Sequence, residues 1–557
     1  MVRRTPLVLV LCAISCTQGE GPSPEKSFPP ETQEVPVQVE QALESLETPS
    51  EANSIRFLEQ ASFGPRLARG VTPAPVGTVE HVRAVGISQA LTEQFALAPS
   101  PDFDGESGRD LGSQFFVRAV TGEDQLRQRV AFALSQILVV SQNGIPDSVK
   151  TSYSEPRVAM ASYMNLLSAQ AFGNFETLLR EVSRHPAMGR YLDMVNNRAF
   201  DANGTIEPNE NYARELLQLF TLGVDLLNID GSPVLVEGKR QPAYSEAQVK
   251  AFAASLSGWT WNAAACPSKG EDILVSDYKN PLMPCLANHD RSSRQLLRGY
   301  STVADAGPVA HMNQALHNIF IHPNVPPFIS RQLIQHLVTS NPSPGYVRRV
   351  ALVFKDDGTG TRGNLQAVVR AILEDVEARG AQPPVSRQAT YGHLRSPALF
   401  ITNVVRWLEP ALDTTTKDPG LRLSNWSKTM NQSVLRAPSV FSYYPPNAPL
   451  PGGGELQGPE FAILDTATLV ARANFLHELL YTNIAASGIT VDYSRLPDTR
   501  EALVAYMDQY WLHDTMSPQL ESKLLTALSH STVNDANRLR KLGLYLTFLS
   551  PSYQVQR

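Results

Sequence analysis

The residues best suited to chemistry gather at the start of one predicted helix, in the segment 207–223 with the sequence EPNENYARELLQLFTLG. The candidates for catalysis are Glu210, Arg214 and Glu215, and the candidates for binding are Asn209 and Asn211. Carboxylates, a guanidinium and amides at a helix N-terminus suit an anion, a sugar hydroxyl or a metal. The alternative is a helix cap with surface ion pairs, each worth only a few tenths of a kcal/mol.

The helix that must position these groups is indicated by its pattern. Asn209 is predicted to be the N-cap, since its side chain can accept a hydrogen bond from a first-turn amide. Glu210 and Arg214 are four residues apart and are expected to pair. Gly223 is expected to end the helix. An apolar stripe is predicted at Tyr212, Leu216, Leu219 and Phe220.

A second group of candidates lies further along the chain. His289 is a candidate catalytic residue, and Asp290 and His322 are candidate binding residues that could share a pocket with the 209–215 cluster. Imidazoles and carboxylates in one pocket could do general acid–base work or hold a divalent cation. There is no HExxH or comparable motif, so a divalent metal is possible here without a firm motif that indicates it, and the cofactor is unknown. The alternative for His322 is a plain loop before a helix.

Aromatic residues beside Pro- and Gly-rich loops could stack on sugar rings. The candidates are Trp259, Tyr443 and Tyr444, together with Trp261 and Phe441. The alternative is packing in the core under a long loop. A standard serine hydrolase is disfavoured because the sequence has no Gly-x-Ser-x-Gly elbow.

The pattern of the whole chain predicts a mostly α-helical protein with few short strands. Its length of 557 residues favours a helical core at 51–380 and a further helical part at 381–557 that packs on it. The net charge of −6 argues against a nucleic-acid partner. Helices are predicted over 123–141, 157–171, 174–184, 246–257, 328–339, 344–354 and 362–373.

The N-terminus predicts export. Two arginines precede the apolar run Leu7–Ile14, which is too short to span a membrane and typical of a signal peptide. Residues 13–16, Ala-Ile-Ser-Cys, resemble a lipobox, although leucine is commoner than Ala13 at its first position. We therefore expect a lipoprotein signal at 1–16 and a lipid anchor on Cys16 in the cell envelope. The alternative is an unmodified cysteine within the signal.

The segment that follows, 17–50, is rich in Pro and Glu, so we expect a disordered tether. Beyond the signal two cysteines remain, Cys266 and Cys285, in one loop of an exported chain. Such cysteines predict a disulfide, which in the chain-entropy model contributes about 3 kcal/mol.

Taken together, several blocks of the chain resemble a large bacterial family of exported proteins, domain of unknown function 1800. The resemblance implies a secreted or surface protein, often encoded beside an exported family with a phosphatase- or sulfatase-like look, and it covers nearly everything after residue 50. The blocks are RFLEQASFGP at 56–65, RQRVAFALSQILVVS at 127–141, AFGNFETLLREVSRHPAMGRYLDM at 171–194, PNENYARELLQLFTLGVDLLNIDG at 208–231, HPNVPPFISRQLIQHLVTSNPSPGYVRRV at 322–350, RAPSVFSYYPPNAP at 436–449 and SPSYQVQR at 550–557.

Three functions are compatible with these features. One is an enzyme acting on an extracytoplasmic polysaccharide or its sulfated or phosphorylated derivatives. Another is a non-catalytic surface protein that binds a glycan or another exported protein. The third is a plain structural component of the surface.

The lipid anchor can be tested by mass spectrometry of the mature protein isolated from membranes. We expect an N-terminal peptide that begins at Cys16 and carries added acyl mass. A mature chain that lacks Cys16, or carries it unmodified, would contradict the prediction.

Overall fold

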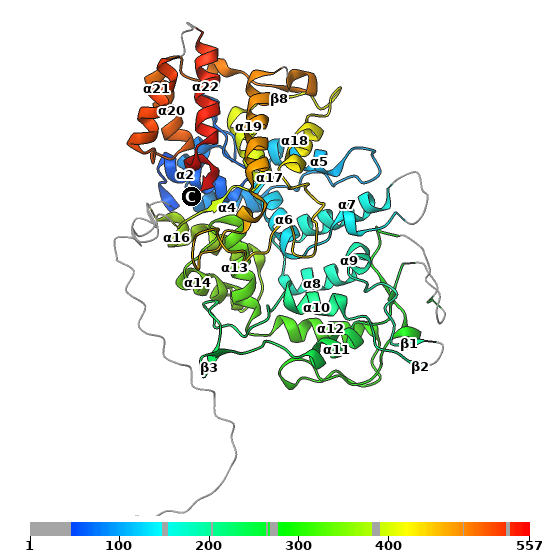
Figure 1. The fold of residues 1–557 in the computed structure, drawn as a ribbon. Coiled ribbons are helices and arrows are strands. Elements are labelled where there is room, and N and C mark those ends of the chain that lie inside the picture. The colour runs from blue at the N-terminus through cyan, green and yellow to red at the C-terminus, as the bar shows by residue number, and fades with distance from the viewer. Residues whose placement is uncertain are drawn as a thin grey trace, which may run out of the picture.

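The protein is described by a computed structural model over residues 46–147, 154–201, 204–262, 266–267, 277–380, 390–482, 484–530 and 535–557. Within these ranges, the chain forms twenty-two α-helices and five pairs of two-residue antiparallel strands (Figure 1). The prediction of a mostly α-helical protein is therefore confirmed. The predicted signal peptide, Cys16, most of the tether and the start of the predicted boundary at 381 lie outside the described residues.

The N-terminal helices surround α6 (Gln125–Ile137), where only Arg127 and Ser135 are not fully buried. Helix α6 confirms the helix predicted over 123–141, although it ends four residues earlier, at Ile137. Phe63 and Phe115 pack edge to face at 5.4 Å beside it. The preceding helices are α2 (Glu51–Ala61), α3 (Val79–Val85), α4 (Ile87–Ala96) and α5 (Leu111–Thr121).

The middle of the chain adds six helices on one side of α6, visible at the lower right of Figure 1. Ser245 and Gln248 form a reciprocal capping box at the start of α11. The helices are α7 (Glu155–Ala169), α8 (Phe175–Arg184), α9 (Pro186–Tyr191), α10 (Asn211–Gln218), α11 (Glu246–Ser255) and α12 (Pro308–Phe320).

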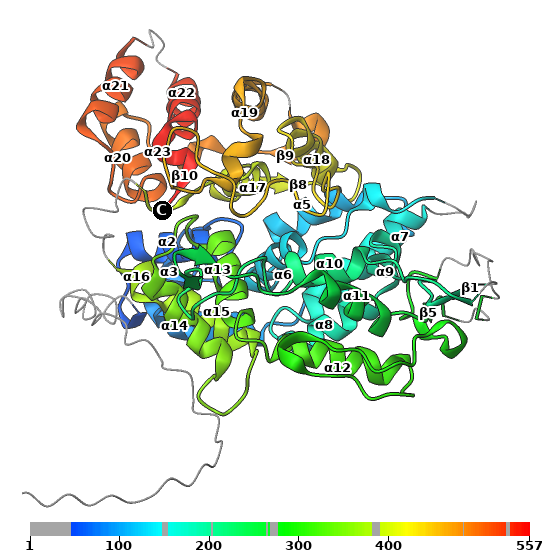
Figure 2. The same ribbon diagram turned by 60° about the horizontal axis from the view of Figure 1, so that its bottom comes forward.

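A further group of four helices lies beside the N-terminal helices in both views (Figures 1 and 2). These helices are α13 (Val325–Leu337), α14 (Pro344–Lys355), α15 (Leu365–Glu374) and α16 (Val376–Arg379). The buried guanidinium of Arg129 in α6 donates to the carbonyl of His336 in α13 at 2.5 Å. This bond fixes α13 against the central helix.

The C-terminal helices lie together at the top of Figure 2. They are α17 (Pro397–Leu408), α18 (Pro419–Thr429), α19 (Thr466–Tyr481), α20 (Arg500–Trp511), α21 (Pro518–Ser529), α22 (Ala536–Leu549) and α23 (Pro551–Gln554). Helix α18 crosses α5 closely, because a Cβ at Gly420 would lie 2.2 Å from the carbonyl oxygen of Ser113.

The strands are too short to form a sheet core. The last one, β10 (Val555–Gln556), pairs with β7 (His393–Leu394), so that Gln556 is buried one residue before the exposed C-terminus. The others are β1 (Phe200–Asp201) with β2 (Gly204–Thr205), β3 (Leu235–Val236) with β4 (Lys239–Arg240), β5 (Trp259–Thr260) with β6 (Met283–Pro284), and β8 (Ala411–Leu412) with β9 (Ile489–Thr490).

A buried polar network joins the two ends of the chain. Glu59 of α2 is fully buried and pairs with Arg395, whose guanidinium also donates to the carbonyl of Tyr553. His513 lies 3.4 Å from the same carboxylate. The Tyr553 hydroxyl donates to Asn403 of α17 at 2.5 Å. Burial alone raises the pKa of Glu59, but Arg395 and His513 lower it to about 2.

Membrane spans were sought among these helices. Within the described ranges, no helix combines the length and the apolar character needed to cross a bilayer.

The network makes Glu59 a sensitive position. We expect Glu59→Gln to lower the free energy of unfolding by about 3–5 kcal/mol, because it leaves Arg395 buried without a counter-charge. Urea unfolding measures the change. The control, Glu501→Gln, alters a side chain that is 71% exposed and should stay within about 0.5 kcal/mol of wild type. Equal stability of the two variants would contradict the structural role of the pair.

Three histidines, the buried His322 and the half-buried His185 and His336, predict acid sensitivity. Burial lowers the pKa of His185 and His322 to about 4 and that of His336 to about 3. A free histidine titrates near 6.5, so as pH falls below that value the unfolded chain takes up protons before the folded one does. Folding stability should fall by about 1.4 kcal/mol per pH unit for each histidine between pH 6.5 and 4.

Urea unfolding at pH 7 and pH 5 tests this pH dependence. In the control His322→Gln, stability should fall less steeply between these pH values than in wild type. A flat profile in the wild-type protein would contradict the assignment. The contribution of Glu59 belongs to a separate window, since its lowered pKa makes its stabilisation disappear only as pH falls from about 4.5 towards 2.

Candidate functional site

The predicted helix at 209–223 is shorter than expected. Helix α10 begins at Asn211, with Glu210 rather than Asn209 in the N-cap position. The Asn209 amide donates to Asn197 Oδ1 at 2.8 Å, and its carbonyl accepts from Asn197 Nδ2 at 2.9 Å. These bonds hold Asn209 outside the helix, although its side chain still accepts from the Asn211 amide at 2.8 Å. The helix ends at Gln218, five residues before Gly223, so the predicted N-cap and helix end are both wrong.

Glu210 and Arg214 form the expected ion pair, at 2.7 Å. Arg214 also makes a two-pronged contact with Glu246 of α11, at 2.6 and 3.0 Å. The Arg214 side chain is 37% exposed and that of Glu246 is 60% exposed. Asn211 turns away and donates to Asp193 at 3.1 Å. The helix mouth is therefore a surface ion-pair network that joins α10 to α11, in which two carboxylates share the guanidinium of Arg214.

Glu215 differs from its neighbours. It is half-buried, and its Oε2 atom is buried with no hydrogen-bond partner in the structure. Burial raises the pKa of this carboxyl, while the charge of Arg214 opposes the rise. Among the described residues, no group of three or more His, Cys, Asp or Glu residues could hold a metal ion. Glu215 is thus a carboxyl that protonates easily, without a metal-binding partner set.

His289 does not join this cluster. Its Nδ1 atom donates to the carbonyl of Ser257 at 2.8 Å, and its Nε2 atom lies 2.8 Å from Nδ1 of His311. The neighbouring Asp290 is buried and pairs with Arg294. Burial lowers the pKa of His289. His289 therefore joins the turn after α11 to α12 with both of its ring nitrogens occupied, whereas Asp290 holds its own loop through Arg294 and the amide of Ser292.

His322 and Asn324 hold the chain that leaves α10. The buried Asn324 side chain donates to the carbonyls of Leu222 and Asp225, at 3.1 and 2.8 Å, and accepts from the amide of Leu227 at 3.0 Å. His322 Nδ1 accepts from the Asn324 amide at 3.2 Å. These residues are buried positioning groups and do not meet Glu210 or Arg214 in any contact of the structure.

The predicted disulfide between Cys266 and Cys285 is present, with a Cα–Cα distance of 5.4 Å.

The prediction that Trp259, Tyr443 and Tyr444 stack on sugar rings is wrong, because all three side chains are buried. The Tyr443 hydroxyl donates to the carbonyl of Ser433 at 2.8 Å, which turns the ring inward. Trp261 is buried as well, whereas Phe441 of the same long loop is 44% exposed.

A cavity of about 450 Å³ lies beyond the end of α10, and we call it the amide cleft. Its walls come from α6, the C-terminal end of α10, the turn and hairpin at 222–240, α13 and the loop at 440–457. The lining residues are Gln136, Ile137, Gln218, Leu219, Leu222, Gly223, Val224, Asp225, Leu227, Gly231, Pro233, Arg240, Phe328, Arg331, Gln332, Gln335, Val440, Phe441, Pro445, Pro446, Asn447 and Gln457.

The polar groups of the amide cleft come mainly from one face of α13. Gln335 Nε2 donates to Gln457 Oε1 at 2.8 Å, and Arg331 donates to the same oxygen at 3.1 Å. Gln332 is 6% exposed, and its buried Nε2 atom has no hydrogen-bond partner in the structure. A buried donor without a partner costs about 1–3 kcal/mol, which a ligand acceptor would recover.

Arg331 is the charged group of the amide cleft. It forms no ion pair with any residue that the structure describes, and burial lowers its pKa. Asp225 is the single carboxylate among the described lining residues, and it is paired with Arg240 at 3.0 Å. The lining contains no Ser, His or Cys. The cleft is therefore equipped for binding, and a nucleophile with its base is not present among its described residues.

The apolar side of the amide cleft is formed by Phe328 and the exposed Phe441. Gly223 has φ +76°, and a Cβ there would lie 2.9 Å from the ring of Phe328. A glycine at this position allows the chain to turn tightly against the aromatic ring.

The residues of the amide cleft were missed by the sequence reasoning, although a signal was present. Phe328, Arg331, Gln332 and Gln335 are spaced i, i+3, i+4 and i+7 and so share one face of α13. Three long polar side chains on one face of a largely apolar helix indicate a face that meets water or a ligand.

Comparison with known proteins gives one match. A family model described as "Protein of unknown function (DUF1800)" matches residues 56–555. Neither the curated proteins nor the solved structures contain a match. Since the matched region spans nearly all of the folded chain, the protein belongs to the DUF1800 family.

Proposed function

We propose that this protein is an exported, lipid-anchored surface protein that binds an extracytoplasmic polysaccharide in the amide cleft. Export and the anchor are supported by the apolar run Leu7–Ile14 and the lipobox-like residues before Cys16. The anchor would hold the folded part at the envelope through the tether.

The observation that carries the proposal is the unpartnered amide of Gln332 beside the unpaired guanidinium of Arg331. Sugars present many hydroxyls that both donate and accept, and glutamine side chains do the same. The exposed face of Phe441 offers apolar contact to a sugar ring at low entropic cost. Arg331 adds a donor for an acidic substituent such as a carboxylate or sulfate.

A second candidate function is catalysis on the same polysaccharide, and the unpaired, half-buried carboxyl of Glu215 favours it. Glu215 lies one helical turn before Leu219, which lines the amide cleft. A carboxyl with a raised pKa is suited to donate a proton to a glycosidic oxygen. This candidate lacks a second carboxylate at the same place among the described residues.

Glycan binding by the purified full-length protein tests the proposal. We expect Arg331→Gln and Phe441→Ala to weaken binding to an array-selected polysaccharide by about tenfold each, which corresponds to about 1.4 kcal/mol. Tyr300→Ala is the matched control for Phe441→Ala, because it removes a ring that is 40% exposed outside the cleft. Isothermal titration calorimetry measures the affinities.

The same series separates binding from catalysis. Under the binding proposal, Glu215→Gln binds as wild type does, and the polysaccharide is recovered intact. Release of reducing ends that Glu215→Gln abolishes would favour the enzyme. If no glycan binds, or if Tyr300→Ala weakens binding as much as Phe441→Ala, the amide cleft is not the binding site.

A further inference from the structure

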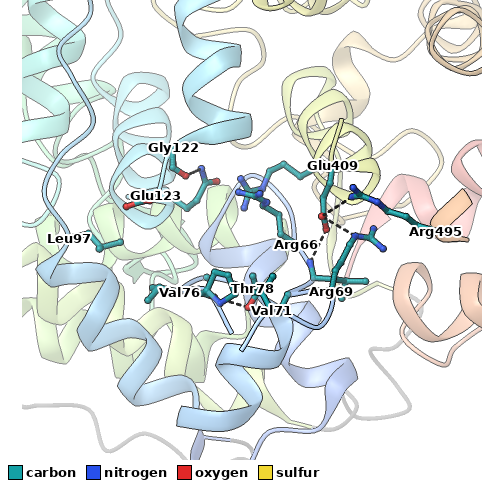
Figure 3. Close-up of a pocket in the computed structure, with 16 residues that line it drawn as sticks. Arg66, Arg69, Val71, Val76, Thr78, Leu97, Gly122, Glu123, Glu409 and Arg495 are labelled. Atoms are coloured by element: carbon teal, nitrogen blue, oxygen red, sulfur yellow. Dashed lines mark hydrogen bonds and ion pairs between the residues drawn. The ribbon is translucent and has the colours of Figure 1, made fainter. Parts of the chain in front are cut away.

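A second cavity, of about 820 Å³, lies at the other end of α6 and is lined by arginines (Figure 3). We call it the arginine cavity. It is formed by residues 66–78 after α2, Leu97, residues 122–125 at the start of α6, the end of α17 and Arg495. Its charged lining residues are Arg66, Arg69, Arg406, Arg495, Glu123 and Glu409. Positive charges therefore outnumber negative ones by two.

Glu409 is the carboxylate that pairs with the arginines on one side of the cavity. Glu409 accepts from Arg69 Nε at 3.0 Å and from the amide of Leu67 at 3.0 Å. Arg495 lies 4.0 Å from the same carboxylate and 3.3 Å from Asp492. Figure 3 shows Glu409 between Arg69 and Arg495, with Arg66 on the side toward Glu123.

The two remaining guanidiniums have no counter-ion among the described residues. Arg406 is buried and donates to the carbonyls of Gly64 and Val120, at 2.5 and 2.8 Å. Carbonyl oxygens accept its hydrogen bonds, and the charge of Glu409 acts on it without a direct ion pair among the described residues. Arg66 is exposed in the cavity wall, and its side chain makes no hydrogen bond or ion pair within the described ranges. Burial and the charge of Arg66 together lower the pKa of Arg406 to about 9, and the charge of Glu409 opposes the shift.

We propose that the arginine cavity binds a tetrahedral oxyanion, a sulfate or phosphate group carried on a larger organic molecule. A divalent anion between Arg66 and Arg406 would neutralise the charges of these two guanidiniums. The planar guanidinium fork matches the oxygens of such groups. The cavity is far larger than a free ion needs, and its apolar wall of Leu67, Val71, Val76 and Leu97 can cover the organic part. This site is separate from the amide cleft and does not rest on the proposed function.

Calorimetric titration of the full-length protein with inorganic sulfate, inorganic phosphate and a sugar monosulfate tests the inference. All titrations are made at constant ionic strength, because sulfate also stabilises proteins by exclusion from their surface. We expect one binding site, with the sugar monosulfate binding more tightly than inorganic sulfate. Arg66→Gln should weaken sulfate binding at least tenfold. Glu409→Gln should strengthen it, since a competing carboxylate is removed.

Two controls locate the effect. Arg538→Gln removes an exposed arginine of α22 outside the cavity and should bind sulfate as wild type does. Arg331→Gln should also leave sulfate binding unchanged, so that failure here and failure of the amide cleft are told apart. The proposal is wrong if wild type binds none of the three probes, or if Arg66→Gln, checked for folding by circular dichroism, binds them as well as wild type.

Discussion

The buried carboxylate of Glu59 is the charge on which the packing of the two ends of the chain depends. Removing Glu59 and Arg395 from water costs several kcal/mol for each ion, and their mutual contact offsets that cost only if the geometry is held. The contact is held because Arg395 also reaches the carbonyl of Tyr553, at the last helix. Helix α2 and the C-terminal residues thus fold against each other, across the predicted boundary at 381.

Elsewhere in the structure, polar groups with a structural role already have partners, whereas polar groups suited to binding do not. At the mouth of α10 the guanidinium of Arg214 is shared by two carboxylates, and His289 has both nitrogens engaged. These groups have little left to offer a ligand. In the two cavities the opposite holds, since Gln332 has a buried amide nitrogen without a hydrogen-bond partner and the exposed side chain of Arg66 has no partner among the described residues. Unmatched hydrogen-bonding capacity is a better guide to function here than local density of charge.

The periodicity of apolar residues was enough to predict the helical class and the helices near 123–141 and 246–257, because these depend on neighbours in sequence. The disulfide followed from compartment and count. The grouping of His289 with Glu210 failed, because it required contacts between distant segments that spacing does not encode. The prediction that Tyr443 and Tyr444 are exposed for sugar stacking failed for a similar reason. Their hydroxyls are held inward by the carbonyl of Ser433 and the side-chain amide oxygen of Gln136, and spacing in the sequence does not reveal these contacts.

Helix α6 connects the arginine cavity to the amide cleft. Gln125 at its first residue lines the arginine cavity, and Gln136 near its last residue lines the amide cleft, about 16 Å away along the axis. The helix between them is buried in a close-packed interior that does not deform gradually. A ligand that shifts α6 at one end must therefore move a wall of the other cavity, and by thermodynamic linkage each occupant would change the affinity for the other by the same factor.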